Sequence, residues 1–122
     1  MVNQAQLGMG NIPIVLDGNE YILVPSLNAT QSLSRQNGGI RGAVDALVKL
    51  DFDLVVRVIQ LGLGPKVAAG IKNLPEVVYH TGLTDNTGGL AAKCIEYLNV
   101  LANGGRPLDV EASQDTQNPP NA

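Results

Sequence analysis

Two short runs of β-forming residues, placed around an Asp-Gly pair and followed directly by Pro-Ser, limit most strongly what this chain can fold into. Asp17-Gly18 suits a type I′ turn, because both residues tolerate the positive φ angles that such a turn needs. Pro25 has no N–H to donate and ends the second run, and Ser26 can accept a hydrogen bond from the free amides of a helix start. Residues 12–24 are therefore predicted to form a β-hairpin that leads straight into a helix.

The second predicted strand is apolar on both faces. Tyr21 and Leu23 share one face, and Ile22 and Val24 share the other. A two-stranded hairpin is not stable alone in water, so we expect helices to cover one face. Part of the other face is then left for a docked helix or a partner chain.

The first two helices are predicted from their caps and their periodicity. A helix over residues 26–36 should end at Asn37-Gly38-Gly39, which tolerates the left-handed conformation. The next helix carries apolar residues at i, i+3, i+4, i+7 and i+8, which predicts one buried stripe. That stripe consists of Ile40, Ala43, Val44, Leu47 and Val48.

The third predicted helix opens at Asp51 or Asp53 and should be central, because its apolar residues nearly encircle it. They are Phe52, Val55, Val56, Ile59 and Leu61. Gly62-Leu63 is expected to end this helix. Residues 65–72 then form either a short helix or an irregular connection.

Two more helices are predicted in the second half of the chain. A short one begins at Leu74-Pro75, where proline suits the first turn, and ends at Gly82-Leu83. The last helix should run over residues 86–102 and stop at Gly104-Gly105 before Pro107. Its expected buried face consists of Ala91, Cys94, Ile95, Leu98, Leu101 and Ala102.

The predicted fold is a small α+β domain, mostly α-helical, with about four to five helices and an N-terminal β-hairpin. A chain of 122 residues suits one domain, and 44% apolar against 3% aromatic residues favours a helical core of small aliphatic side chains. Residues 1–10 are expected to be a flexible lead-in and 11–105 the globular domain. Residues 106–122 lose their periodicity, carry Asp109, Glu111 and Asp115, and are expected to be a disordered acidic tail.

Charge and cysteine content make several classes of protein improbable. The formal net charge is −3 and no basic stripe is present, so we expect no nucleic-acid partner. A single cysteine, Cys94, forms no intrachain disulfide. No run of eighteen apolar residues and no signal-peptide pattern occur, so we expect a soluble cytosolic protein without a membrane partner.

The residues that could do chemistry do not form a recognisable site. His80 is the only histidine, and with one cysteine it cannot complete a structural zinc site of the usual ligands. Cys94 falls on the apolar face of the last helix, where burial keeps a thiol protonated and inert. We therefore predict no catalytic, metal-binding or cofactor-binding residues and no enzymatic activity.

Protein binding remains, and three residues are the candidates for it. Tyr21 and Leu23 lie on the second strand of the hairpin, and Tyr79 follows in a later helix next to His80. Tyrosine is enriched at the energetic centres of protein interfaces. The alternative for each residue is that it completes the small core.

The order of these motifs resembles the gene transfer agent family of phage tail assembly chaperones. The shared order is a hairpin with an Asp-Gly turn, Pro25-Ser26 at a helix start, Gly38-Gly39-Ile40, and an apolar helix ending in Gly-Leu. The likeness extends over residues 12–105 and includes the second Gly-Leu and the long last helix. Residues 31–36, in contrast, lack the acidic residue that is expected near the end of the first helix in this family.

The resemblance implies a non-enzymatic protein that acts in the host cytoplasm during assembly and is absent from the mature virion. Its partners would be the tape measure protein, a long hydrophobic helical chain kept soluble by the chaperone, and the tail tube protein. Two alternatives stay open: a structural minor tail or tail completion protein of the virion, and a small bacterial adaptor or regulator. The sequence specifies no oligomeric state.

Overall fold

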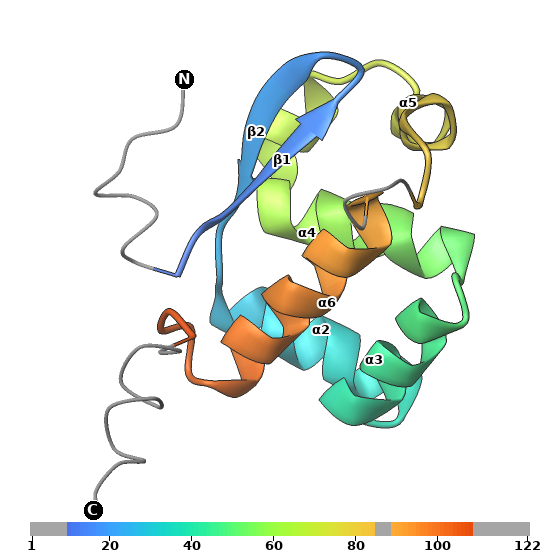
Figure 1. Ribbon diagram of the computed structural model, residues 1–122. Coiled ribbons are helices and arrows are strands. Elements are labelled where there is room, and N and C mark those ends of the chain that lie inside the picture. Colours follow the sequence, from blue (N-terminus) through green and yellow to red (C-terminus); the bar gives the residue numbers. More distant parts are fainter. Residues whose placement is uncertain (1–9, 85–88, 109–122) are drawn as a thin grey trace, which may run out of the picture.

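The hairpin and its turn form as the sequence predicts (Figure 1). In the computed structural model, which describes residues 10–84 and 89–108, β1 (Ile12–Leu16) pairs antiparallel with β2 (Asn19–Leu23). Asp17 and Gly18 have φ angles of 52° and 84°, and a type I′ turn requires positive values at both positions. β2 ends one residue before Val24-Pro25, so the predicted strand end is also confirmed.

One face of the hairpin belongs to the core, and the other faces away from it. In the strand register Ile12 opposes Leu23 and Ile14 opposes the half-buried Tyr21, whereas Leu16 opposes Asn19, which is exposed. The buried side chains among these are Ile12, Ile14, Leu16 and Leu23. β2 packs on helix α4 (Phe52–Ala69), and β1 packs on α5 (Leu74–Thr81) and α6 (Gly89–Ala102). The expectation that helices cover one face is confirmed.

Helix α2 (Leu27–Asn37) begins and ends at the predicted caps. The Ser26 hydroxyl accepts a hydrogen bond from the Ala29 amide at 3.0 Å. At the other end Gly38 and Gly39 have φ angles of 73° and 99°, and the Gly39 amide donates to the Ser34 carbonyl at 2.7 Å. This bond spans the left-handed glycine and satisfies one of the last free carbonyls of the helix.

Helix α3 (Ile40–Val48) shows the predicted stripe with one exception. Ala43 and Leu47 are fully buried, whereas Val48 is 65% exposed and was wrongly placed on the stripe. Val48 is the last residue of α3, and the chain then turns through Lys49 and Leu50, so the core does not extend to it.

Helix α4 is central, as predicted, because it packs against β2 and all four other helices of the described chain. Asp51 caps it, with one carboxylate oxygen accepting from the Leu54 amide at 3.1 Å. In Figure 1, α2 and α3 lie at the end of the molecule away from the hairpin turn.

The predicted end of this helix at Gly62-Leu63 is wrong. Both residues are helical and buried, and the helix breaks at Gly64, where φ is 87° and ψ is 160°. Pro65, which has no N–H to continue the ladder, then starts a short second part that ends at Ala69. Gly62 is needed for another reason: a Cβ atom there would lie 2.9 Å from Cβ and Cδ2 of Leu23.

Helix α5 has Pro75 in its first turn and ends at Gly82, where φ is 94°, as predicted. Helix α6 is described from Gly89, so its predicted start at residue 86 lies outside the described residues. Ala102 was placed on the buried face of α6 but is exposed, because it lies in the last turn. The buried residues of α6 are Leu90, Ala91, Cys94, Tyr97, Leu98, Val100 and Leu101.

The first and the last residues of the described domain lie next to each other. Gly10, at a φ of 85°, lies against the backbone of Gly105 and Arg106, so closely that a side chain at position 10 would collide with the Gly105 carbonyl. Most of the predicted lead-in, residues 1–9, and most of the predicted tail, residues 109–122, lie outside the described residues.

Candidate protein-binding surface

The three residues predicted to bind a partner lie in different surroundings and do not form one surface. Tyr79 is 70% exposed on α5, and Tyr21 is half-buried on the inward face of β2. Leu23 is completely buried between β1 and the glycine of α4 that faces it. In this structure Leu23 is therefore a core residue, and only Tyr79 of the three is freely accessible.

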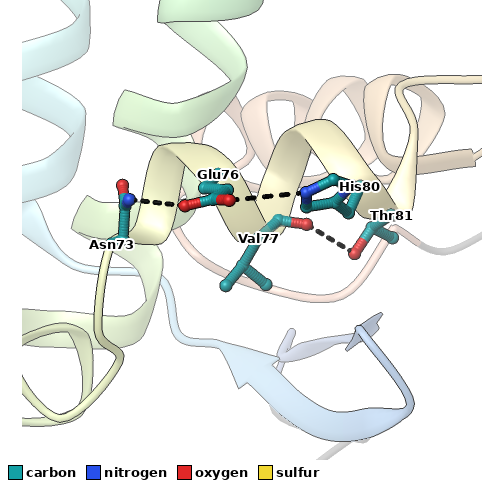
Figure 2. A network of polar contacts seen from close by, with 5 residues as sticks. All are labelled: Asn73, Glu76, Val77, His80 and Thr81. Atoms are coloured by element: carbon teal, nitrogen blue, oxygen red, sulfur yellow. Dashed lines mark hydrogen bonds and ion pairs between the residues drawn. The ribbon is translucent and has the colours of Figure 1, made fainter.

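The ring of Tyr79 contacts His80, which belongs to a polar network on α5. Figure 2 shows that network. The His80 ring packs edge-on against the Tyr79 ring, with centroids 5.4 Å apart and planes at 68°. His80 Nε2 lies 3.5 Å from a Glu76 oxygen, and Asn73 Nδ2 donates to the other oxygen at 2.7 Å. Because the side chains of His80 and Glu76 are 62% and 59% exposed, water and salt weaken this pair. Tyr79 is thus a single exposed ring beside the exposed polar side chains of His80 and Glu76.

Thr81 fixes α5 to the hairpin turn. Its hydroxyl donates to the Val77 carbonyl at 2.8 Å, which Figure 2 shows, and accepts from the Asp17 amide at 3.0 Å. One hydroxyl thus satisfies both a carbonyl at the end of α5 and an amide of the turn. The hairpin is held at its tip as well as along its inward face.

The side of the hairpin that faces away from the core carries exposed apolar side chains. We call it the outer hairpin face and define it by Pro13, Val15, Ile22 and Val24. The strand register places Pro13 opposite Ile22, and Val15 and Val24 are 52% and 47% exposed. The prediction that the second strand presents apolar residues on both faces is confirmed, with Ile22 and Val24 on the outer one, where Glu20 also lies opposite Val15.

A groove continues the outer hairpin face toward α2. It has a volume of about 510 Å³, and Val24 and Leu27 both line it. Leu27 is 72% exposed, the largest exposed fraction among the large apolar side chains of the described chain. The remaining lining residues are Asn11, Pro25, Ser26, Thr30, Leu101, Gly104 and Gly105.

The backbone of Val24 is fixed from two sides, so the exposed side chains near it are held in place. Its amide donates to the Gly62 carbonyl at 2.8 Å, just before the break in α4. Its carbonyl accepts from the Tyr97 hydroxyl of α6 at 2.7 Å. A rigid apolar surface loses less conformational entropy on binding than a mobile one.

Burial keeps two titratable side chains of the core, Cys94 and Tyr97, in their protonated forms. Burial raises the pKa of the Cys94 thiol to about 12, so the thiol stays protonated at neutral pH and is a poor nucleophile. Burial, with a smaller effect of Cys94, also raises the pKa of Tyr97. Within residues 10–84 and 89–108, no group of three His, Cys, Asp or Glu side chains is placed to hold a metal ion. None of the helices described is both long and apolar enough to cross a membrane.

The sequence prediction missed the exposure of Leu27, although helix geometry carried a signal for it. The buried residues of α2 are Ala29 and Leu33, four positions apart and on one face. Leu27 lies about 120° around the helix from Leu33 at 3.6 residues per turn. A leucine so far from the buried face, and directly after the cap, is expected to point outward.

Comparison with protein-family models, with curated proteins and with solved structures found no match to this chain.

Proposed function

We propose that this protein is a non-enzymatic phage tail assembly chaperone that binds the tape measure protein and assists assembly of the tail tube. The order of motifs over residues 12–105, which resembles the gene transfer agent family of these chaperones, suggests the identity of the client. The structural observation that supports binding is the outer hairpin face, which continues through the groove to Leu27.

This surface suits an apolar helical client. Val15, Val24 and Leu27 are each about half exposed or more, and they are interrupted by small or polar residues such as Ser26. An amphipathic helix binds such a groove by placing its apolar side chains at i, i+3, i+4 and i+7 into it. Covering these side chains removes apolar surface from water, which is the main driving force of such association.

Coexpression with the tape measure protein encoded alongside this chain tests the proposal. We expect the client to be soluble with the wild-type chain and to precipitate without it. The double variant Val24→Thr, Leu27→Gln should leave most of the client insoluble, because it replaces two exposed apolar side chains that line the groove. A client that is equally soluble alone contradicts the proposal.

Val48→Gln is the matched control for this experiment. Val48 is 65% exposed, much like Leu27, but lies on α3, away from the hairpin (Figure 1). Substitutions at exposed positions change stability by about 0.5 kcal/mol or less, so both variants should stay folded. The control should therefore keep the client soluble.

The presence or absence of the protein in mature particles, together with the solubility of the tape measure protein, distinguishes the chaperone from two alternatives. A structural minor tail or completion protein is present in purified mature particles at a fixed ratio, whereas a chaperone that acts in the host cytoplasm is absent from them. Mass spectrometry of purified particles measures this. A bacterial adaptor or regulator is absent from particles too, and it leaves the solubility of the tape measure protein unchanged.

A further inference from the structure

A second depression lies at the break in α4. Its volume is about 470 Å³, and it is lined by residues of α4 on both sides of Gly64 and by Asn28 of α2. The residues that matter here are Asn28, Arg57, Gln60, Leu61, Gly64 and Pro65. Asn28, which lines this depression, directly follows Leu27, which lines the groove of the proposed client surface.

Among the described residues that line this depression Arg57 is the only charged one, and not all of its hydrogen-bond donors have an acceptor. A guanidinium carries five N–H donors in a planar fork. Arg57 donates from Nη2 to the Ser32 hydroxyl at 3.1 Å, while its Nε is buried and makes no hydrogen bond. No carboxylate lies within ion-pair distance of Arg57 in the described chain.

A partly buried guanidinium without an anion is an uncommon arrangement, because a buried donor that lacks an acceptor costs free energy. Carboxylates match the guanidinium fork with two parallel N–H···O bonds, and these bonds are stronger when water is partly excluded. The amide side chains of Asn28 and Gln60 supply further donors at the rim of the depression. The apolar side chain of Leu61 would pack against the carbon atoms next to a bound carboxylate.

We infer that this depression receives a carboxylate of the client protein, an acidic side chain on the helical segment that covers Leu27. Charge complementarity with Arg57 identifies the group, and the sequence neighbours Leu27 and Asn28 connect the two sites. The inference names one contact of the proposed chaperone and so rests on that function. It predicts that the client segment combines apolar residues with an aspartate or glutamate.

The first experiment measures carboxylate binding without the client. Acetate and inorganic phosphate are titrated separately into the full chain, and NMR follows the Arg57 Nε–H signal and the backbone amides of Ser32 and Gly64. We expect a saturable shift with acetate that is lost in Arg57→Met. No saturable shift with either ion overturns the inference, and a shift with phosphate alone overturns the choice of a carboxylate.

The second experiment measures the affinity for the tape measure protein in low and high salt. Methionine keeps an unbranched, apolar stem at position 57 and removes only the charged fork. Charge-assisted hydrogen bonds are strong enough that Arg57→Met should weaken binding roughly 10- to 100-fold and flatten its salt dependence, and Arg57→Lys should be intermediate. Thermal unfolding of each variant checks that it is folded.

The outcomes of the two experiments separate the inference from the proposed function. If Arg57→Met binds the client as the wild type does, the carboxylate contact is wrong and the chaperone function stands. If the wild type does not bind the client, the proposed function is wrong, and so is a client carboxylate, whatever acetate does.

Two other occupants give distinct results. Should the acidic residues of this chain fill the site, neutralising them as Asp109→Asn, Glu111→Gln and Asp115→Asn in the full chain would shift the Arg57 signal without added ions. Should a second copy fill it, the signal would change with protein concentration. Either result overturns the inference, and we expect neither.

Discussion

Replacement of Gly62 by alanine should raise the helix propensity of α4 but crowd the core next to it. The contacts of a Cβ atom at this position show which effect is larger. Gly62 lies inside α4 and faces Leu23, which is completely buried. A Cβ atom at this position would lie 2.9 Å from Cβ and Cδ2 of Leu23 and 3.3 Å from its Cα. Two of these contacts are with atoms close to the backbone, so a rotation of the leucine side chain does not relieve them and β2 itself has to move.

The packing effect is the larger one. Alanine in place of glycine inside a helix gains about 1 kcal/mol. Overpacking of a filled core costs about 1–3 kcal/mol, and moving β2 weakens the bond from the Val24 amide to the Gly62 carbonyl, worth about 1 kcal/mol. The net loss of stability is therefore about 1–3 kcal/mol. For a domain of this size it lowers the melting temperature by roughly 5–20 °C.

Thermal unfolding followed by circular dichroism measures this loss, with Gly70→Ala as the control. Gly70 ends α4 at a φ of −78° and ψ of −9°, a conformation open to any residue, and its closest neighbour beyond a new Cβ is the Val67 carbonyl oxygen at 3.4 Å. Gly70→Ala should unfold at the wild-type temperature or slightly above, because alanine restricts the unfolded chain. A Gly62→Ala variant as stable as Gly70→Ala would refute the packing argument.

Two further predictions concern the buried side chains of α6. Tyr97→Phe removes the hydroxyl that donates to the Val24 carbonyl and should lower the free energy of unfolding by about 1–2 kcal/mol, measured by urea unfolding, whereas an unchanged urea midpoint contradicts a role for this bond. The raised pKa values of Cys94 and Tyr97 also give stability a pH dependence: both groups stay protonated in the folded chain while they ionise in the unfolded chain, so stability should be constant near neutral pH and fall as the pH rises above about 9. Cys94→Ala should reduce this slope by about 1.4 kcal/mol per pH unit between roughly pH 9 and 11, and equal slopes in both proteins contradict the burial of the thiol.

Local chemistry made the hairpin and the first helix predictable from sequence. Asp17-Gly18, Ser26 and Gly38 act through φ angles and hydrogen bonds to residues at most five positions away. Such interactions are present in the sequence itself, because each residue type has few ways to satisfy its own backbone. The structure confirms all three.

Gly62 was misread because the reason for this glycine is tertiary. Its pattern with Leu63 is that of a helix end, but Leu23, which excludes any side chain at position 62, is far away in the sequence. The real break, Gly64-Pro65, is equally visible in the sequence and only two residues later. Without the strand in place, nothing distinguishes a glycine that ends a helix from one that lets a strand approach it.

Only the local part of the candidate surface was predicted, because the rest depends on tertiary packing. The apolar character of both hairpin faces is a local pattern, and it was predicted. Which face the helices cover depends on the whole packing arrangement, so Leu23 was predicted to contact a partner although it is buried, and the exposure of Leu27 was missed. The sequence did not indicate a role for Arg57, because its lack of a carboxylate partner among the described residues appears only once the chain is folded.

The contact between Gly10 and Gly105 brings the two ends of the described domain together. Joining these two points needs only a short link, so the domain is geometrically suited to insertion into a surface loop of another protein or to new ends at the Asp17-Gly18 turn. A protein joined directly to Gly10 or to Gly105 would begin next to Asn11 or at Gly105, and both of these residues line the groove with Val24 and Leu27. A tether attached at Lys49 or Leu50, beyond α3, would leave that rim free.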